Sequence, residues 1–482
     1  MSYRFKTKPF KHQEDCFEIN KNRKFFAELM EMGTGKSKVL LDTAAYMYDQ
    51  GWINALHIFG NKGSYMNWLT NEIPEHFPEH IPIKTGYWKA SMNKKEELAL
   101  ESMLKESFFG LKIFVQNIES MAYDRSVEVA KKFVSGHRTL VTVDESSTIK
   151  NHTAKRTKAM LKLRDLAKVR RILTGSLVDN RPLDAYSQFE FLNPACLGFS
   201  SFYSFRAQYA EMIDMNLRNS TRPVKVVKGF KNIEDLKNRI SKHSFIIKKE
   251  DCLDLPPKVY QTFNVELTDE QIKHYNDLKL RCMTEVGQET VSVRIVLTKL
   301  MRLHQLVCGH LKDDEGSIHK VANNRMAALL DLLEESSGQV IIWANYREDI
   351  KDIAEAIGKE YGVESVLTYF GDTTEEERAE AKRSFRNDEQ IGEARFLVAN
   401  PQTGGYGLTL NGASTVIYYS NSFDAEKRNQ SEDRCHRYGQ TKSVTYIDIV
   451  AKDTIDEKIL KVLKDKKALS EAITVSNWQT FL

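Results

Sequence analysis

The hydrophobic positions of this chain gather into short runs that are apolar throughout, and longer segments with helical spacing separate most of them. A run without polar alternation is typical of a strand that is buried on both faces of a sheet. The alternation of such strands with helices predicts an α/β fold with parallel sheets. The predicted strands are residues 25–30, 55–59, 113–116, 139–143, 172–174, 340–344, 396–399, 416–419 and 444–450. The clearest predicted helices are residues 38–50, 153–168, 324–335 and 375–385.

Two stretches break this alternation and divide the chain. Residues from about 195 to 250 and from about 262 to 320 are long, charged and helix-like, so we interpret them as helical insertions. Between them, Pro256 and Pro257 disfavour helix on both sides. A single core stops growing at about 250–300 residues. We therefore expect lobe 1 at residues 1–251, a linker at 252–258 and lobe 2 at 259–482, with a C-terminal helix at about 454–470 that braces lobe 2.

Composition narrows the class of protein only slightly. The net charge of +4 comes from 70 basic and 66 acidic residues, so the whole-chain balance barely favours an anionic partner. The six cysteines lie far apart without a C-x-x-C pair, which disfavours a zinc module or a disulfide framework. The chain has no apolar core of signal-peptide length, and no run approaches the roughly 20 apolar residues of a membrane helix. We expect free thiols and a soluble, cytoplasmic protein without a membrane partner.

A glycine-rich turn provides the first candidate chemistry. Met32 is followed by Gly33, Thr34, Gly35, Lys36 and Ser37, between a predicted strand and a predicted helix. This is the strand–loop–helix context of a phosphate-binding loop, in which Lys36 would meet the β- and γ-phosphates and Ser37 would bind Mg²⁺. ATP and Mg²⁺ are therefore the predicted ligands. The first glycine of the usual motif falls on Met30, and taken alone the turn could be a chance match.

Asp144 and Glu145 directly follow the predicted strand at 139–143. Ligands of parallel sheets lie beyond the carboxyl ends of the strands, so we expect this pair, Gly175 and the glycine turn to meet at one edge. Asp144 is expected to hold Mg²⁺ through water, and Glu145 to orient or deprotonate the attacking water. A pair of ordinary loop carboxylates is the alternative, which the presence of Lys36 disfavours.

Arg434 and Arg437 lie three residues apart near the end of the chain, on what we predict to be one helical face. A planar guanidinium can stabilise the charge that spreads over a phosphoryl group. A solvated arginine face on a surface helix is the alternative. The flanking Gln430 and Gln440, Gly439 and the chain position favour the phosphate role.

These motifs, in this order, resemble the Snf2-type branch of superfamily 2 helicase-like ATPases from about residue 8 to residue 470. The further matching segments are residues 10–13, 67–68, 143–151, 173–180, 191–194, 300–305, 404–410, 430–440 and 453–459. The resemblance implies two RecA-like lobes that close on ATP, with the two arginines reaching the γ-phosphate from lobe 2. It implies that Gln13 contacts the adenine. It also adds Gly405 and Gln430 to the nucleotide-binding set, which otherwise consists of Gly33, Thr34, Gly35, Lys36, Ser37, Arg434 and Arg437.

Fewer residues point directly to nucleic acid. The resemblance implies that Asn67, Asn117, Lys150 and Thr409 contact the backbone of the nucleic acid. Phosphate contacts of this kind carry no sequence code. The basic segment at residues 150–171 fits such a surface, and it equally fits an ordinary solvated helix face. Trp68 and Trp343 invite base stacking, but aromatic residues beside buried strands are more often core.

Two departures from the family pattern concern coupling. Ser146 and Ser147 replace the usual Ala-His or Cys-His pair after the acidic residues, and Leu177 replaces an expected proline. The residues of hydrolysis themselves are intact. The departures therefore concern the link between ATP turnover and DNA contact.

The expected function is a DNA-dependent ATPase that translocates along double-stranded DNA and remodels or displaces what is bound there, without full strand separation. One competitor is a strand-separating helicase or an RNA-dependent ATPase of the same superfamily. Another is a scaffold without catalysis, which the intact Lys36, Asp144, Glu145, Arg434 and Arg437 disfavour. No chromatin-reader module or zinc finger is visible. We expect a minimal, monomeric motor from a bacterium or a bacterial virus, with targeting supplied by a protein partner or by DNA structure.

Overall fold

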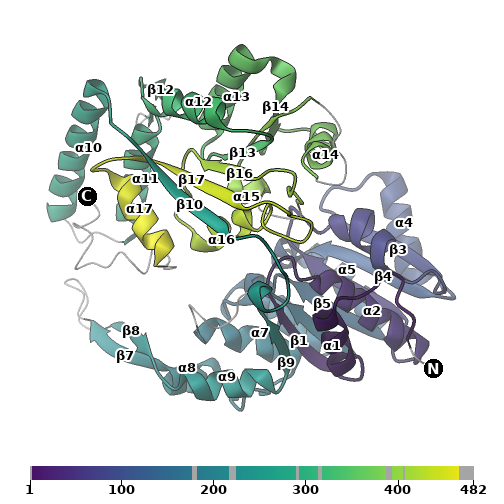
Figure 1. Cartoon of the computed structure of the whole chain (residues 1–482). Helices are drawn as coiled ribbons and strands as arrows, with labels where there is room; N and C mark the ends of the chain where they lie inside the picture. Colours follow the sequence, from purple (N-terminus) through teal and green to yellow (C-terminus); the bar gives the residue numbers. More distant parts are fainter. Residues whose placement is uncertain are drawn as a thin grey trace. The chain divides into compact units, whose positions relative to one another are not determined.

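The computed structural model describes residues 3–175, 182–215, 224–288, 293–312, 317–386, 393–404 and 408–465. The chain divides into two compact units, Met1–Leu253 and Asp254–Leu482, which we call lobe 1 and lobe 2 (Figure 1). The division falls within the segment 252–258 that carries the two prolines. Each lobe is built on its own parallel sheet with helices on both faces, as the hydrophobic pattern predicts.

The sheet of lobe 1 has seven strands in the order β3-β4-β2-β5-β6-β1-β9. All of its paired strands are parallel. The strands are β1 (Phe25–Met30), β2 (Ala55–Gly60), β3 (Ile83–Trp88), β4 (Leu111–Asn117), β5 (Thr139–Asp144), β6 (Val169–Leu173) and β9 (Ser244–Ile247). Because every strand runs the same way, the loops after their carboxyl ends lie along one edge of the sheet.

Helices bury both faces of this sheet. They are α1 (Lys11–Asn20), α2 (Lys36–Asp49), α3 (Ile73–His76), α4 (Lys94–Lys105), α5 (Asp124–Ser135), α6 (Lys155–Arg164), α7 (Ala185–Leu192), α8 (Phe202–Tyr209) and α9 (Ile233–Ser241). Short helical turns connect them: η1 (Trp68–Glu72), η2 (Ile118–Ala122), η3 (Ser146–Ile149), η4 (Pro182–Asp184) and η5 (Lys249–Asp251). Successive strand residues face opposite sides. Ala55 and Phe59 therefore join the core under α5 to α9, whereas Leu56 and Ile58 join the core under α2 and α3.

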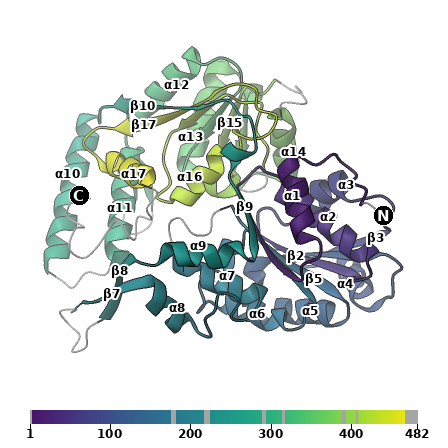
Figure 2. The same ribbon diagram turned by 60° about the horizontal axis from the view of Figure 1, so that its bottom comes forward.

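The predicted all-helical insertion at about 195–250 is wrong in part. Besides α8 and α9, this stretch contains an antiparallel hairpin of β7 (Ala210–Met215) and β8 (Val224–Phe230), seen with its neighbouring helices in Figure 2. It ends in β9, which pairs in parallel with β1 at the edge of the main sheet. Strand β9 is short and only partly buried, and its apolar run, residues 245–247, is shorter than that of most inner strands.

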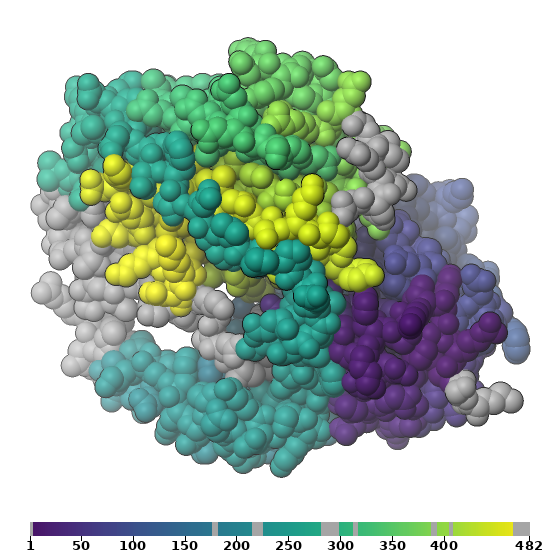
Figure 3. Space-filling model, viewed as in Figure 1, coloured from purple at the N-terminus to yellow at the C-terminus, as the bar shows by residue number. Residues whose placement is uncertain are grey.

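Lobe 2 contains a six-stranded parallel sheet in the order β10-β17-β16-β13-β15-β14. Its strands are β10 (Lys258–Val265), β13 (Val340–Trp343), β14 (Val366–Tyr369), β15 (Phe396–Ala399), β16 (Thr415–Tyr418) and β17 (Val444–Ala451). The inner strands β13 and β15 are fully buried, whereas the edge strand β10 is mostly exposed. Figure 3 shows residues of β10 (teal) beside those of β17 (yellow) on the surface of this lobe.

The helices of lobe 2 again cover both faces of its sheet. They are α10 (Asp269–Gln288), α11 (Val293–Val307), α12 (Arg325–Glu335), α13 (Arg347–Tyr361), α14 (Glu375–Ser384), α15 (Pro401–Gly404), α16 (Ala425–Glu432) and α17 (Ile455–Lys464), with the turn η6 (Val363–Ser365). Ile342 packs with α11, α12, α13 and α17, whereas Trp343 packs on the other side with α14. Trp343 is thus a core residue.

Two further expectations for lobe 2 need correction or restriction. The stretch at 262–320 is mainly helical, but β10 runs into it as far as Val265, and it also holds the hairpin of β11 (His310–Lys312) and β12 (Ile318–Lys320). The predicted brace helix is described as α17, and its expected end at about 470 lies outside the described residues. Of the helices in the described part of the chain, none combines the length and apolar composition that crossing a bilayer requires.

Candidate nucleotide site

The candidate residues of lobe 1 gather along the carboxyl edge of its sheet. The glycine turn follows β1, Asp144 ends β5 and Gly175 follows β6. A Cβ on Gly175 would lie 3.3 Å from the Met32 backbone nitrogen, so the end of β6 and the glycine turn are in contact. The expectation that these segments meet at one edge is confirmed.

The glycine turn has the backbone of a phosphate-binding loop. Gly33 and Gly35 have φ angles of 80° and 88°, in the left-handed region that favours glycine. The Thr34 hydroxyl donates to the Glu31 carbonyl oxygen at 2.7 Å and braces the turn. Helix α2 begins at Lys36, directly after Gly35. Its first backbone N–H groups therefore face the turn, where they can bind an anion.

Lys36 rests on the turn that it follows. Its Nζ donates to the carbonyl oxygens of Met30 at 2.7 Å and Glu31 at 3.3 Å, and the residue is only 9% exposed. Met30, which stands where the usual motif has its first glycine, thus contributes its backbone carbonyl. Ser37 is the second residue of α2 and is half-buried. The ammonium and the hydroxyl therefore lie at the N-terminus of one helix.

Gln13 lies directly against the glycine turn. Its Nε2 donates to the Thr34 carbonyl oxygen at 3.1 Å, and its Oε1 accepts from the Phe10 backbone N–H at 3.0 Å. A Cβ on Gly35 would stand 2.2 Å from Gln13 Nε2, so a larger residue would displace that side chain as well as strain the left-handed backbone. His12 Nε2 also lies 2.8 Å from the Thr34 oxygen. The segment supports the loop in this structure, and the adenine contact of Gln13 stays a prediction.

Asp144 is held through both of its carboxylate oxygens. Oδ2 accepts from the Trp68 indole Nε1–H at 3.2 Å, and Oδ1 accepts from the Glu145 backbone N–H at 3.0 Å. Burial raises the pKa of Asp144, while the nearby Lys36 ammonium and the two hydrogen bonds act in the opposite direction. Lys36 and Asp144 are therefore close enough to interact electrostatically. Glu145 adopts a left-handed φ of 50°, which is uncommon for a non-glycine residue and costs conformational energy.

The side chains at this edge of the sheet are suited to bind Mg²⁺ together with the phosphates of a nucleotide. Mg²⁺ prefers hard oxygen ligands and keeps several waters when it binds a nucleotide. The Ser37 hydroxyl and the Asp144 carboxylate are donors of this kind. The Lys36 ammonium and the N-terminus of α2 suit the accompanying phosphates. On the chemistry of its donors, the edge of the lobe 1 sheet can therefore hold Mg²⁺ with a nucleotide triphosphate.

The segment after the acidic pair is fastened to helix α7. The buried Ser146 hydroxyl donates to Gln188 Oε1 at 2.5 Å, and the Ser187 hydroxyl donates to the Lys150 carbonyl oxygen at 3.0 Å. Lys150 Nζ also lies 3.6 Å from an Asp184 carboxylate oxygen. Leu177, the other departure from the family pattern, lies outside the described residues. Ser146 thus makes a specific contact of its own in place of the usual residue.

Three of the four nucleic-acid candidates share the same edge of lobe 1. Asn67 follows β2, Asn117 ends β4 and Lys150 follows β5, and these three strands are neighbours. Asn67 Nδ2 donates to Glu72 Oε1 at 3.1 Å, and Asn117 Oδ1 accepts from the Glu119 backbone N–H at 2.8 Å. The fourth candidate, Thr409, belongs to lobe 2 and is half-buried. Their contact with nucleic acid stays a prediction.

The two arginines of lobe 2 do not lie on a helical face, which corrects the sequence prediction. Helix α16 ends at Glu432, and Arg434 and Arg437 follow in turns. Beyond the helix, the fully buried Cys435 belongs to the core cluster that includes Leu408 and Leu410. The guanidinium groups nevertheless converge, since Arg434 Nη1 and Arg437 Nη1 donate to the same Leu408 carbonyl oxygen at 3.3 and 3.2 Å.

Helix α16 is anchored by a buried arginine that sequence reasoning missed. Arg428 pairs with Asp448 on β17 (Nη2 to Oδ2, 3.1 Å) and with Glu432 (Nε to Oε1, 2.9 Å). Its guanidinium carbon also lies 3.4 Å from the ring centroid of Tyr418. Gln430 is buried on this helix, and its backbone oxygen accepts from Arg434 Nε at 3.2 Å. Gly405, the remaining nucleotide candidate, lies outside the described residues.

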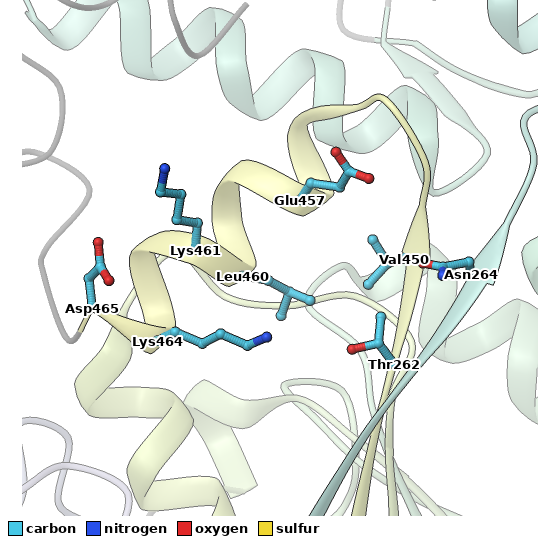
Figure 4. Close-up of a pocket in the computed structure, with 8 residues that line it drawn as sticks. All are labelled: Thr262, Asn264, Val450, Glu457, Leu460, Lys461, Lys464 and Asp465. Atoms are coloured by element: carbon cyan, nitrogen blue, oxygen red, sulfur yellow. The ribbon is translucent and has the colours of Figure 1, made fainter.

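A separate cavity in lobe 2 is lined by none of the predicted site residues. It has a volume of about 380 Å³ and lies between the β10–β17 strand pair and α17. Figure 4 shows Lys464 extending from α17 toward Thr262 on β10, beside Leu460. Acidic, basic, polar and apolar side chains line this cavity, and no glycine-rich turn is among the described residues that line it.

The contacts that sequence reasoning missed join distant parts of the chain. His12 and Trp68 contact residues 22 and 76 positions away, and Gln188 contacts one 42 positions away. Periodicity and motif spacing carry no signal for such pairs. One local signal could have indicated the ion pair of Arg428. Its charge is opposite to that of Glu432, and the two residues are four positions apart, which is one helical turn.

Comparison with known proteins gives matches over most of the chain. The SNF2-related domain model matches residues 30–312, and the model of the helicase conserved C-terminal domain matches residues 324–439. An uncharacterized ATP-dependent helicase of Mycoplasma genitalium is 26% identical over 94% of this chain and 40% of its own length. The TATA-binding protein-associated factor MOT1 of Saccharomyces cerevisiae is 27% identical over 70% of this chain and 20% of its own length.

Two further similarities complete the comparison. A Bacillus subtilis protein, YwqA, named as a candidate ATP-dependent helicase/translocase, is 27% identical over 71% of this chain and 36% of its own length. The solved structure of the Sulfolobus solfataricus SWI2/SNF2 ATPase core in complex with dsDNA aligns with 100% of this chain and 96% of that chain, at 21% identity and a TM-score of 0.42. The chain thus spans 40% or less of the curated relatives named here. Because the SNF2-related domain model covers more than half of its residues, the chain belongs to the SNF2-related family.

Proposed function

We propose that this protein is an ATPase that double-stranded DNA stimulates, and that it uses ATP hydrolysis to translocate along the duplex without fully separating the strands. Such movement would remodel or displace structures and proteins bound to the DNA. The activity would take place in the cytoplasm, with a targeting protein or a DNA structure selecting the site of action.

The proposal assigns each candidate residue a task in phosphoryl transfer. Lys36 and the N-terminus of α2 bind the β- and γ-phosphates, and Ser37 and Asp144 hold Mg²⁺, which neutralises charge on the phosphates when bound. Glu145 orients or deprotonates the attacking water. Arg434 and Arg437 stabilise the charge that develops on the transferred phosphoryl group.

One observation carries the proposal: Lys36, on the turn after β1, and Asp144, at the end of β5, lie at the same carboxyl edge of a parallel sheet, close enough to interact electrostatically, in a chain of the SNF2-related family. Lys36 lies on the glycine turn and Asp144 ends the strand β5, as nucleotide hydrolysis by a phosphate-binding loop requires. A scaffold without catalysis would have no need for this pair together with Glu145 and the two arginines.

The choice of duplex DNA is supported by the family and by the names of its members. One relative is named as a candidate helicase/translocase, and another as a factor associated with a TATA-binding protein. The predicted contacts Asn67, Asn117 and Lys150 share the edge that carries Asp144. A strand-separating helicase or an RNA-dependent ATPase is the competing proposal.

Steady-state ATP hydrolysis under four conditions tests this function: without nucleic acid, with duplex DNA, with single-stranded DNA and with RNA. The variant Glu145→Gln serves as the control for contaminating ATPases, because it keeps the shape of the site and removes the carboxylate. We expect duplex DNA to stimulate turnover strongly, and single strands and RNA to fail to match it.

The other outcomes each point elsewhere. A preference for single strands or RNA would favour the competing helicase or RNA-dependent ATPase. No turnover beyond that of Glu145→Gln under any condition would contradict an autonomous motor and favour the scaffold.

A further inference from the structure

Trp68 stands at an unusual place in lobe 1. It is the first residue of η1 (Trp68–Glu72), a π-helical turn that follows β2. Such turns are rare in proteins, and those that occur are often found at functional sites. The side chain is 2% exposed and packs in the core cluster beneath α2 and α3. Core packing explains the burial of the ring, but it does not explain the direction of its one polar atom.

That polar atom is directed at the carboxylate assigned to magnesium. The indole Nε1–H donates to Asp144 Oδ2 at 3.2 Å. An indole nitrogen can only donate and a carboxylate oxygen accepts, so the two groups are matched as donor and acceptor. Together with the Glu145 backbone N–H on Oδ1, the indole fixes the plane of the carboxylate. Each oxygen keeps a further lone pair for a metal-bound water.

The turn that presents the indole also presents a predicted nucleic-acid contact. Asn67 immediately precedes Trp68, and its side-chain amide donates to Glu72 Oε1 at 3.1 Å, at the other end of η1. Asn71 Nδ2 also donates to Asn67 Oδ1. The side chain of Asn67 is therefore tied to the same π-helical turn as the indole. Strand β2, which precedes this turn, is the direct neighbour of β5, which Asp144 ends.

We propose that Trp68 is a positioning residue that joins nucleic-acid contact to the metal site. Its indole N–H sets the orientation of the Asp144 carboxylate toward magnesium-bound ATP. A shift of the turn when Asn67 meets a phosphate of the nucleic acid moves the indole with it, and so adjusts the carboxylate. The coupling half of this inference rests on the proposed function, whereas the metal half requires only that the site binds magnesium-bound nucleotide.

The variant Trp68→Phe tests both halves, because it keeps an aromatic ring in the core and removes the N–H donor. Trp88→Phe is the matched control: Trp88 is 3% exposed in the same lobe, on β3, at the far edge of the sheet. The first readout is the Mn²⁺ or Mg²⁺ concentration at which a fluorescent ATP analogue is half bound. The second is the ratio of ATP turnover with duplex DNA to turnover without it. Thermal melting monitors the fold.

For Trp68→Phe we expect the half-saturating metal concentration to rise about tenfold, the usual effect of removing a hydrogen-bond partner of a metal ligand. We also expect the stimulation ratio to fall by about threefold or more. Trp88→Phe should change neither value, although both variants lose a similar buried volume. If Trp68→Phe does not fold, the wild-type indole N–H resonance in a ¹⁵N–¹H spectrum replaces it, and we expect that resonance to shift when Mg²⁺ is added to the nucleotide complex.

Each contrary result overturns one half of the proposal or both. An unchanged metal requirement in Trp68→Phe, or an indole resonance that does not respond to Mg²⁺, would show that the indole only packs. A raised metal requirement with an unchanged stimulation ratio would overturn the coupling half. If the wild-type protein itself shows no stimulation by DNA, the proposed function and the coupling half fail together, and the metal titration still decides the remaining half.

Discussion

The two lobes hold their candidate residues in different ways. In lobe 1 the residues come from separate strand ends: the glycine turn after β1, Asp144 at the end of β5 and Trp68 after β2. In lobe 2, Gln430, Arg434 and Arg437 come from a single short stretch, which is anchored through Arg428. A substitution in one loop of lobe 1 should therefore impair only the role of that loop, such as phosphate or metal binding. A substitution that displaces the lobe 2 stretch should alter the positions of both arginines.

The largest expected effect is that of Lys36→Ala in lobe 1. The variant removes the ammonium that rests on the glycine turn and interacts with Asp144. We expect ATP turnover to fall to the background of Glu145→Gln, while duplex DNA binding, measured by fluorescence anisotropy, stays intact. Turnover that survives in Lys36→Ala would contradict the assignment of the phosphate site.

Arg437→Ala in lobe 2 should have the next largest effect. Arginine fingers contribute about 10³–10⁵ in rate, because they act on charge that develops in the transition state. We expect kcat to fall by a factor of about 10³ with a much smaller loss of ATP affinity. Measuring kcat and nucleotide binding separately checks this. Equal losses in both would reduce Arg437 to a ground-state contact.

A smaller effect is expected where Ser146 meets α7. Ser146→Ala leaves the buried Gln188 Oε1 without its donor, which costs about 1–3 kcal/mol of folding stability. We expect the DNA stimulation ratio to fall a fewfold, with turnover in the absence of DNA within about twofold of wild type. A double-mutant cycle with Gln188→Ala checks that the two positions act as a pair. Additive effects would show that Ser146 does not act through Gln188.

The smallest effect near neutral pH is expected at Glu28, a buried residue of β1. Burial raises the pKa of Glu28 from its ordinary 4.5 to about 8, against the opposing influence of Arg171 and Asn20. Because the folded protein then holds this proton more tightly than the unfolded chain, the contribution of Glu28 to stability is full below about pH 4.5 and is lost as the pH rises through 8. Glu28→Gln should therefore melt several degrees above wild type at pH 9 and close to it at pH 5. Parallel melting curves at all pH values would contradict this.

The inner part of the fold could be predicted from the sequence, and the edges could not. The predicted strands at 25–30 and 396–399 coincide with β1 and β15, because burial on both faces demands an uninterrupted apolar run. Strands β3, β9 and β10 lie at sheet edges and are only partly buried. Strands β3 and β10 have mixed polarity, and β9 has only a short apolar run, so the hydrophobic pattern does not predict them. The strands within the two insertions are also short or of mixed polarity, so the hydrophobic pattern predicts only helices there.

The candidate site shows a similar division. Lys36 and Asp144 belong to local motifs with a fixed chemistry, so their proximity followed from the parallel sheet. The contact of Trp68 with Asp144 spans 76 residues, and no local pattern encodes it. The helical face expected for Arg434 and Arg437 is wrong, because the spacing of the two arginines does not show that the helix already ends at Glu432. The convergence of both arginines on one carbonyl oxygen depends on tertiary packing.

Displacement of a third DNA strand from a duplex tests the central claim most directly. A triplex-forming strand is released when a protein moves along the underlying duplex, whether or not that duplex is opened. We predict release by the wild-type protein with ATP, and none with a non-hydrolysable analogue or by Lys36→Ala. Failure to release the third strand despite DNA-stimulated hydrolysis, or separation of the two duplex strands instead, would contradict translocation on duplex DNA.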